Sequence, residues 1–224
     1  MTGPQSVATV RHEAPACNSP DRQVAVSDSV IRSNLDLSSR TSINGVVIIR
    51  LATMDDRQAI SELIAESARQ LSREKYTGAQ IEAAIATVFG VDSDLIEDGT
   101  YLVAENLGVM VGCGGWSRRK TLFGGDQYSA RDAGYLDPQS EPAKIRAFFV
   151  HPAHARQGVA RAILSRCESE AKAHGFRALE LMSTLPGIAF YESCGFSQTG
   201  NYDLELTAGV KLELAPMRKE FRCD

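Results

Sequence analysis

Cysteine is scarce in this chain of 224 residues, and no two cysteines form a Cys-x-x-Cys pair. The cysteines are odd in number and scattered along the chain, so they lack the regular spacing of a disulfide framework or of a structural zinc site. We therefore expect no metal, and a reducing, cytoplasmic setting. The five are Cys17, Cys113, Cys167, Cys194 and Cys223.

Long apolar runs and an excess of one charge are also missing. No apolar run approaches the roughly 18 residues that a membrane span needs; the run over 45–49, for example, ends at Arg50. The 24 Lys and Arg residues against 28 Asp and Glu give a net charge of −4. This balance argues against a protein that binds nucleic acid through clustered positive charge. We expect neither a membrane nor a nucleic acid as a partner.

Aromatic residues are absent from the first third of the chain, because the first of them is Tyr76. Residues 1–45 hold instead eight serines, three prolines and four acidic residues. Such a segment buries too little apolar area to offset roughly 1–2 kcal/mol of backbone entropy per ordered residue. We interpret 1–45 as a disordered tail and 46–224 as one domain. The alternative, an organellar targeting peptide, is disfavoured by the acidic residues.

From Val46 onward, hydrophobic periodicity predicts strands and helices in the order βααβββαβαββ, a mixed α/β single domain. Residues 117–142 are a long polar stretch with little periodicity, and a loop of that length is usually functional or disordered. The predicted strands cover 46–51, 101–105, 109–116, 145–150 and 179–182, with strand-like segments near 198–206 and 209–214, and the predicted helices cover 53–68, 77–90, 158–174 and 186–193.

The segment that carries chemistry is a strand over 145–150 followed by a loop and a helix. The first N–H groups of a helix lack intrahelical partners and the helix dipole adds positive charge there, so the N–H groups of 156–160 could hold a phosphate. Gly158 and Ala160 keep side chains out of the way of such a ligand. Many strand–helix junctions contain a glycine for backbone reasons alone, however. The loop also matches neither a P-loop nor Gly-x-Gly-x-x-Gly.

The flanks of this loop make the pattern more specific. In order, they are Val150-His151-Pro152, Gln157 to Leu164, His174-Gly175-Phe176 and Ala189 to Phe196. This series resembles the GNAT superfamily of acetyl-CoA-dependent N-acetyltransferases over about 145–196, while 48–116 fit the family layout only by element order. One position departs from the family: its loop usually opens on Gln or Arg, where this chain has Ala155. Whether Arg156 or Gln157 supplies the missing side-chain contact stays open.

The resemblance implies a GNAT-like mixed sheet in which the strand ending at Val150 splays from the strand near 179–183. The pantetheine arm of acetyl-CoA would lie in that gap, and the pyrophosphate would lie on 156–160. A backbone N–H near Val150 would polarise the thioester carbonyl, and Arg161 could reach a CoA phosphate or remain an ordinary exposed arginine. The implied cofactor-binding residues are Phe149, Val150, Arg156, Gln157, Gly158, Val159, Ala160 and Arg161.

Tyr191 is the catalytic residue that the resemblance implies, as proton donor to the departing CoA thiolate. The alternative is a tyrosine that packs under the sheet with its hydroxyl bonded to backbone. The resemblance assigns no general base to this chain, because Lys144 and Arg146 occupy the strand on which many relatives carry a glutamate. An amine that binds neutral needs no strong base. The open candidates are a water chain, His151, His154, Tyr128, Asp126, Asp137 and Glu141.

The function expected from the sequence is transfer of an acetyl group from acetyl-CoA to a primary amine of a small molecule, by direct attack in a ternary complex. Selectivity for the amine would come from the helices over 53–89 and from the loop over 117–142. The missing strand carboxylate keeps a non-catalytic CoA-binding sensor as a rival, and a plain interaction domain is a second. The sequence leaves a homodimer open.

Deletion of residues 1–42 tests the interpretation of the tail. We expect the melting temperature and the affinity for CoA to stay nearly unchanged, because the deletion removes no aromatic and few large apolar side chains. Calorimetric melting and a CoA titration of both proteins measure this. A melting temperature lower by many degrees would show that the segment docks on the domain.

Overall fold

An eight-stranded sheet is the framework of residues 47–221, which are the residues that this computed structural model describes. Our interpretation of 1–45 as a tail lies outside them. The strand order is β1-β2-β3-β4-β5-β8-β6, with β7 paired to β8, and only β4 and β5 run parallel. The strands are β1 (Val47–Leu51), β2 (Tyr101–Asn106), β3 (Val109–Ser117), β4 (Ala143–Val150), β5 (Ala178–Thr184), β6 (Ser197–Gln198), β7 (Tyr202–Glu205) and β8 (Lys211–Glu220).

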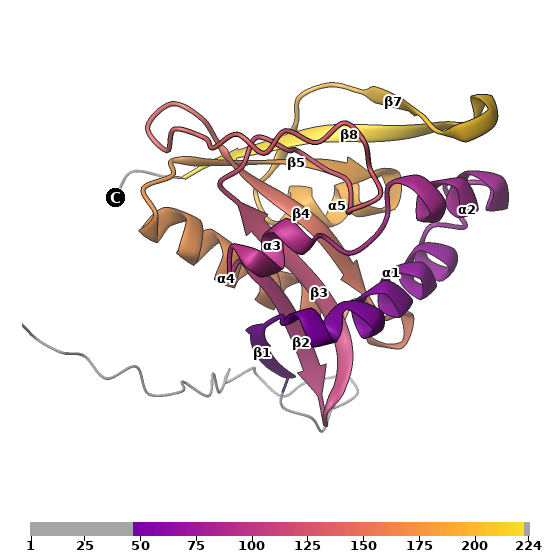
Figure 1. The fold of residues 1–224 in the computed structure, drawn as a ribbon, viewed down its shortest axis with the longest axis horizontal. Coiled ribbons are helices and arrows are strands. Elements are labelled where there is room, and N and C mark those ends of the chain that lie inside the picture. The colour runs from indigo at the N-terminus through magenta and orange to yellow at the C-terminus, as the bar shows by residue number, and fades with distance from the viewer. Residues whose placement is uncertain (1–46, 222–224) are drawn as a thin grey trace, which may run out of the picture. The chain divides into compact units, whose positions relative to one another are not determined.

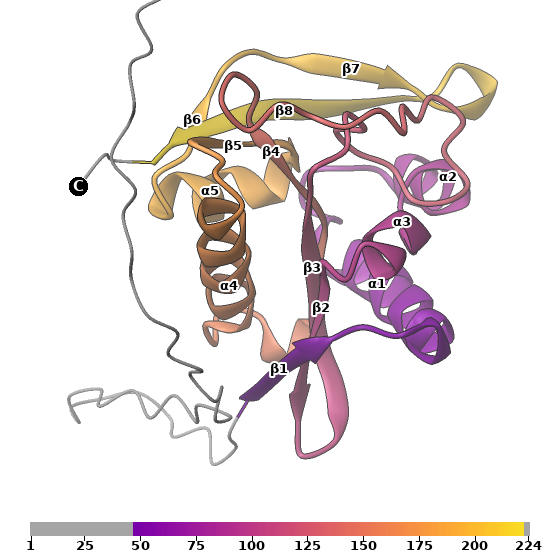
Figure 2. The same ribbon diagram turned by 60° about the vertical axis from the view of Figure 1, so that its left-hand side comes forward.

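Helices cover both faces of this sheet (Figures 1 and 2). One face packs against α4 and α5, and its core is built around the buried Ile163, Leu179 and Tyr191. The other face packs against α1, α2 and α3 in two further apolar clusters. The helices are α1 (Arg57–Leu71), α2 (Gly78–Thr87), α3 (Ser93–Glu97), α4 (Val159–Ala173) and α5 (Ile188–Ser193), and 3₁₀ turns cover Met54–Asp56, Pro152–His154, Leu185–Gly187 and Thr207–Gly209.

The predicted mixed α/β fold is confirmed. Thr53 and Asp56 form a capping box at the start of the helix predicted over 53–68, although a 3₁₀ turn comes first and α1 begins at Arg57. The apolar stripe of α1 is buried, with Ile60 at 0% exposure. Between β2 and β3, Leu107 and Gly108 both adopt positive φ, as a two-residue hairpin turn requires.

The structure differs from the predicted elements in three places. The segment 93–97 forms the short helix α3, and the strand-like segment 198–206 is divided between β6 and β7. The last strand runs six residues past the expected end at 214, to Glu220. Its charged end, Arg218 to Glu220, shows no hydrophobic alternation because these side chains are exposed or half-exposed, while its backbone pairs with β5. None of the helices in 47–221 is long and apolar enough to cross a bilayer.

The close packing of β3 on β4 yields a stability prediction. A Cβ added at Gly114 would lie 2.5 Å from Cδ2 of Phe148, whereas one added at Gly78, the first residue of α2, would meet nothing within 4 Å. We expect Gly114→Ala to lower the free energy of unfolding by about 1–3 kcal/mol through overpacking. Gly78→Ala is the matched control and should cause no loss, because alanine favours helix. Equal denaturation midpoints for the two variants would contradict the packing.

Candidate active site

The parallel pair β4–β5 is hydrogen-bonded at one end only. Pairing covers Ala143–Ile145 of β4 and Leu179–Leu181 of β5 and then stops, so the last five residues of β4 have no β5 partner. Figure 1 shows the two strands diverging beyond this point. The predicted splay is therefore present, and it leaves backbone groups of β4 available to an extended ligand.

A bulge in β4 lies where the strands part. Cys113 pairs with Phe149 and Gly115 with Arg146, so Ala147 and Phe148 lie together opposite Gly114. Ala147 has a φ of 53°, a left-handed conformation that costs energy for any residue with a Cβ. A bulge bends and twists its strand, which is the local reason that β4 turns away from β5.

The predicted phosphate loop joins the end of β4 to α4. Arg156 and Gly158 have φ values of 61° and 88°, and no side chain caps the amides at the start of α4. Val159 is buried under the loop, and Ala160 follows it in the first turn. The five residues 156–160 thus form a sharp turn into an uncapped helix N-terminus, which suits an anionic group.

Two side chains of this region are bonded within the protein. Gln157 folds back, and its Nε2 donates to the carbonyl of Ala153 at 3.0 Å. Arg156 is exposed and has no hydrogen-bond partner in the described part of the chain, so of the two it is the one free to contact a ligand. Arg161, in the first turn of α4, donates to Ser193 Oγ at the end of α5, at 2.9 Å.

Tyr191 is a buried core residue that contacts the diverging end of β4. It projects from α5, which follows β5, and its ring is 6.4 Å from the ring of Phe148 on β4, centroid to centroid. Gly187 packs against the end of β5, since a Cβ there would lie 2.8 Å from Ser183 Oγ. Burial raises the pKa of the Tyr191 hydroxyl, so the side chain is protonated at neutral pH. It is 9% exposed, and Phe190 and Phe196 pack edge-on against it.

The residues in place of a strand glutamate are both ion-paired. Lys144 Nζ lies 2.5 Å from Glu180 Oε2 of β5, directly across the paired end of the strands. Arg146 is buried against Asp92. Glu180 is a carboxylate that sequence reasoning missed, because its proximity to Lys144 depends on the register between two distant strands. Burial raises the pKa of Asp92 and lowers that of Arg146, and their mutual attraction opposes both shifts.

The candidate bases are dispersed rather than gathered at the splay. Nδ1 of His151 accepts from the amide of Ala153, and its Nε2 lies 3.3 Å from Glu66 of α1, while the His154 ring packs near it. Tyr128 packs against Phe123. The amide of Asp137 donates to Glu141 Oε2. The amide of Gln139 donates to Asp137 Oδ1, which lowers the pKa of Asp137. Asp126 belongs to the network of charges described next.

Four arginines and four aspartates form one connected network that holds the long loop. Arg131 is its centre, with ion pairs to Asp92 at 2.8 Å, to Asp94 at 2.5 Å and to Asp126 at 3.9 Å. The eight members come from α1, the α2–α3 segment, the 118–142 loop and β4, and their charges balance. The remaining pairs are Arg57–Asp126, Arg119–Asp94, Arg119–Asp98 and Arg146–Asp92.

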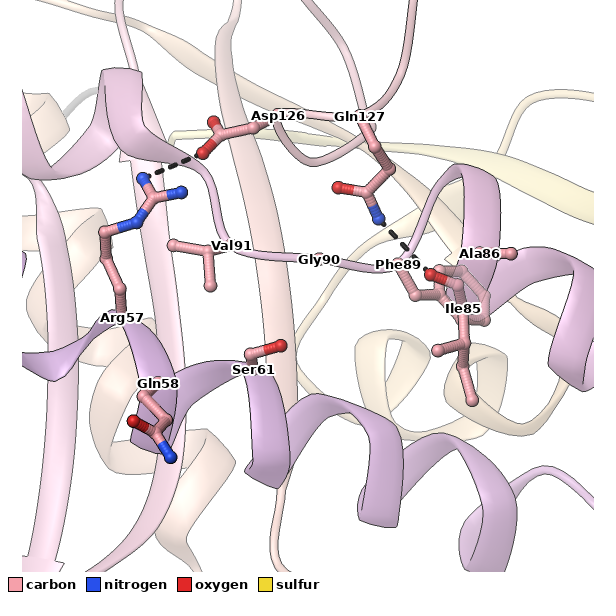
Figure 3. Close-up of a pocket in the computed structure, with 10 residues that line it drawn as sticks. All are labelled: Arg57, Gln58, Ser61, Ile85, Ala86, Phe89, Gly90, Val91, Asp126 and Gln127. Atoms are coloured by element: carbon pink, nitrogen blue, oxygen red, sulfur yellow. Dashed lines mark hydrogen bonds and ion pairs between the residues drawn. The ribbon is translucent and has the colours of Figure 1, made fainter.

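The two segments expected to control selectivity line one pocket of about 440 Å³ (Figure 3). This volume falls in the roughly 300–1,000 Å³ range of small-molecule sites. Phe89 connects the pocket to β4, because its ring packs edge-on against that of Phe149 at 5.6 Å. Helix α1 contributes Arg57 and Ser61, the end of α2 and the segment after it contribute Phe89 and Val91, and the loop contributes Asp126 and Gln127.

Comparison with known proteins identifies the class. The model of the acetyltransferase (GNAT) family matches residues 60–196, which is more than half of the chain. The chain therefore belongs to the acetyltransferase (GNAT) family, as the resemblance over 145–196 predicted. Among curated proteins, no sequence match was found.

Solved structures share the fold at low sequence identity. A GCN5-related N-acetyltransferase from Rhodopseudomonas palustris is 18% identical with a TM-score of 0.58, over 78% of this chain and 95% of that one. YncA from Salmonella typhimurium, solved with its cofactor acetyl-CoA, is 21% identical with a TM-score of 0.53, over 80% and 95%. PaiA N-acetyltransferase from Thermoplasma acidophilum, in complex with coenzyme A, is 14% identical with a TM-score of 0.53, over 78% and 99%.

Substitution of Gly158 tests the phosphate loop. A glutamate there adds bulk and negative charge beside the expected pyrophosphate, and loss of two hydrogen bonds of roughly 1.5–3 kcal/mol each implies CoA binding weakened by about a hundredfold or more. Calorimetric titration with CoA measures this.

Gly108→Glu in the β2–β3 turn is the matched control. It carries the same charge and a similar φ, 78° against 88°, with open space around the Cβ in both cases. We expect this control to bind CoA normally. A folded Gly158→Glu protein with unchanged affinity would refute the loop assignment.

Proposed function

We propose that this protein transfers an acetyl group from acetyl-CoA to a primary amine of a small molecule, by direct attack in a ternary complex. The observation that carries the proposal is the end of β4–β5 pairing after Ile145 and Leu181. An extended pantetheine arm can pair there with β4 near Phe149 and Val150, and the strand leads through the 3₁₀ turn Pro152–His154 to residues 156–160 at the uncapped start of α4.

The N–H groups of this turn would hold the pyrophosphate, with the exposed Arg156 as the side chain free to contact it. Arg161 would reach a CoA phosphate only by releasing Ser193. A backbone N–H near Val150 would polarise the thioester carbonyl. Family structures with coenzyme A or acetyl-CoA bound support acetyl-CoA as the co-substrate.

The acceptor amine would approach from the opposite face, through the pocket beneath α1 and α2. Its nitrogen attacks the thioester carbon, a carbon–nitrogen bond forms, and the carbon–sulfur bond breaks. The nitrogen loses one proton, and the departing thiolate gains one. An amine that binds uncharged loses its proton from the intermediate readily, so the absence of a carboxylate on β4 does not prevent turnover.

Tyr191 would act as donor to the sulfur, with its O–H directed at the charge that develops there as the carbon–sulfur bond breaks. Burial keeps its hydroxyl protonated, as a donor must be, but a raised pKa also makes it a weaker acid than the thiol, whose pKa is near 8.5. We therefore assign to Tyr191 a moderate contribution through a hydrogen bond to the developing thiolate. General acid assistance is typically about 10²–10⁴-fold, and the low end applies here.

Release of free thiol from acetyl-CoA, measured against a panel of small primary amines, tests the function directly. We expect release that depends on one class of amine. Tight CoA binding with no amine-dependent release across the panel would contradict the proposal and favour a CoA-binding sensor.

Tyr191→Phe separates chemistry from packing, because it removes only the hydroxyl. We expect kcat to fall about 10- to 100-fold, with CoA affinity and melting temperature unchanged. Because the pKa of Tyr191 is raised above the ordinary 10, its protonated form persists through alkaline pH. The kcat ratio of the two proteins should therefore be constant from pH 7 to about pH 10. Full activity of the variant, where the chemical step limits the rate, would leave Tyr191 as a packing residue.

A further inference from the structure

One edge of the Arg57 guanidinium is open to the pocket. Its Nη1 donates to Asp126 Oδ2 at 2.9 Å and to Ser93 Oγ. Nε and Nη2 have no partner among residues 47–221, and the side chain is 41% exposed. Figure 3 shows Arg57 at one side of the pocket, with one terminal nitrogen bonded to Asp126 and the other unbonded.

The other polar groups of the pocket are already occupied or neutral. Asp126 accepts from the amide and the hydroxyl of Ser93, at 2.8 and 2.6 Å, as well as from Arg57. Nε2 of Gln127 donates to the carbonyl of Ile85 at 3.4 Å. The charged group of the pocket that can still bind a ligand is therefore a donor. The Asp126 carboxylate already accepts from Ser93 and Arg57, whereas Nε and Nη2 of Arg57 have no partner among residues 47–221.

The facing wall is apolar and leads toward the reactive strand. Ile85 and Phe89 line it, and Phe89 packs against Phe149 of β4. In Figure 3, Phe89 and Arg57 lie on opposite sides of the pocket. A bound acceptor would accordingly place its amine past Phe89, an apolar body in the middle, and its far end at Arg57.

We propose that the acceptor is an amine that carries a carboxylate at its far end, bound by the open edge of Arg57. Two parallel N–H groups on a planar guanidinium match the two oxygens of a carboxylate. A phosphate dianion fits less well, because the surrounding network of charges is already balanced and offers one free guanidinium edge. The inference rests on the proposed function, since it names the substrate class of the same site.

Matched acceptors test the inference. We would compare p-aminomethylbenzoate with p-aminomethylbenzamide, which has the same shape but no charge, and with p-aminomethylphenylphosphonate. Thiol release gives kcat/KM for each, and calorimetry gives their binding to the protein saturated with CoA. We expect the wild-type protein to favour the carboxylate over the amide by about 10- to 100-fold, the worth of a charged hydrogen-bonded pair.

Variants locate the preference. Arg57→Gln should bring the ratio of carboxylate to amide close to one, because loss of the Arg57–Asp126 pair acts on both acceptors alike whereas loss of the open edge acts on the carboxylate alone. Arg57→Lys, which keeps the charge but not the planar edge, should retain part of the preference. Arg69→Gln is the matched control, because Arg69 lies on the same helix, is exposed and pairs with Glu82 away from the pocket. It should keep the wild-type ratio.

Each outcome decides a separate point. Turnover of the amide with no preference for the carboxylate, or a preference for the phosphonate, would overturn the inference and leave the proposed function standing. Equal losses on both acceptors in Arg57→Gln would also overturn it. If no amine is turned over, the proposed function fails, and the binding titration alone decides whether Arg57 receives a carboxylate. Binding of the benzoate that Arg57→Gln weakens at least tenfold supports the inference in that case.

Discussion

The loss of the β5 partner after Ile145 is the constraint on which the rest of the site depends. Strands that stay paired satisfy their own backbone groups and leave nothing for a ligand. The bulge at Ala147 turns β4 away, and the ring of Phe148 fills the space that Gly114 leaves. The ring of Tyr191, on the helix after β5, packs 6.4 Å from that of Phe148. The proposed cofactor edge, phosphate turn and proton donor therefore all depend on one interruption of a parallel pair.

Charge, rather than secondary structure, holds the loop that lines the pocket in place. The loop 118–142 has no helix or strand of its own beyond one isolated bridge, between Arg119 and Tyr135. Arg131 ties it to the α2–α3 segment, and Asp126 ties it to α1. The Asp92–Arg146 pair connects this network to the bulged strand itself. Removing one partner of such a buried pair leaves an uncompensated charge that costs about 3–5 kcal/mol, so pocket wall and reactive strand form one electrostatic unit.

The features that could be predicted from the sequence are those that depend on residues close together in the chain. The capping box at Thr53, the apolar stripe of α1 and the strand–loop–helix unit over 145–174 lie within short windows, where periodicity and turn residues are informative. The pocket between α1 and the loop 118–142 could not be predicted in the same way. Its charged members, Arg57 and Asp126, are 69 residues apart in sequence. Glu180 next to Lys144 likewise follows from strand register, and α3 is too short to show a period.

Amide hydrogen exchange with and without CoA tests the central claim most directly, because it reports where the cofactor contacts the backbone without any substitution. The account predicts slower exchange in two places: the amides of 146–150 that have lost β5 as a partner, and the amides of 157–160 at the start of α4. The β2–β3 turn at Leu107 and Gly108 should exchange at the same rate in both states. Protection elsewhere, with these two segments unchanged, would contradict the placement of CoA between β4 and β5.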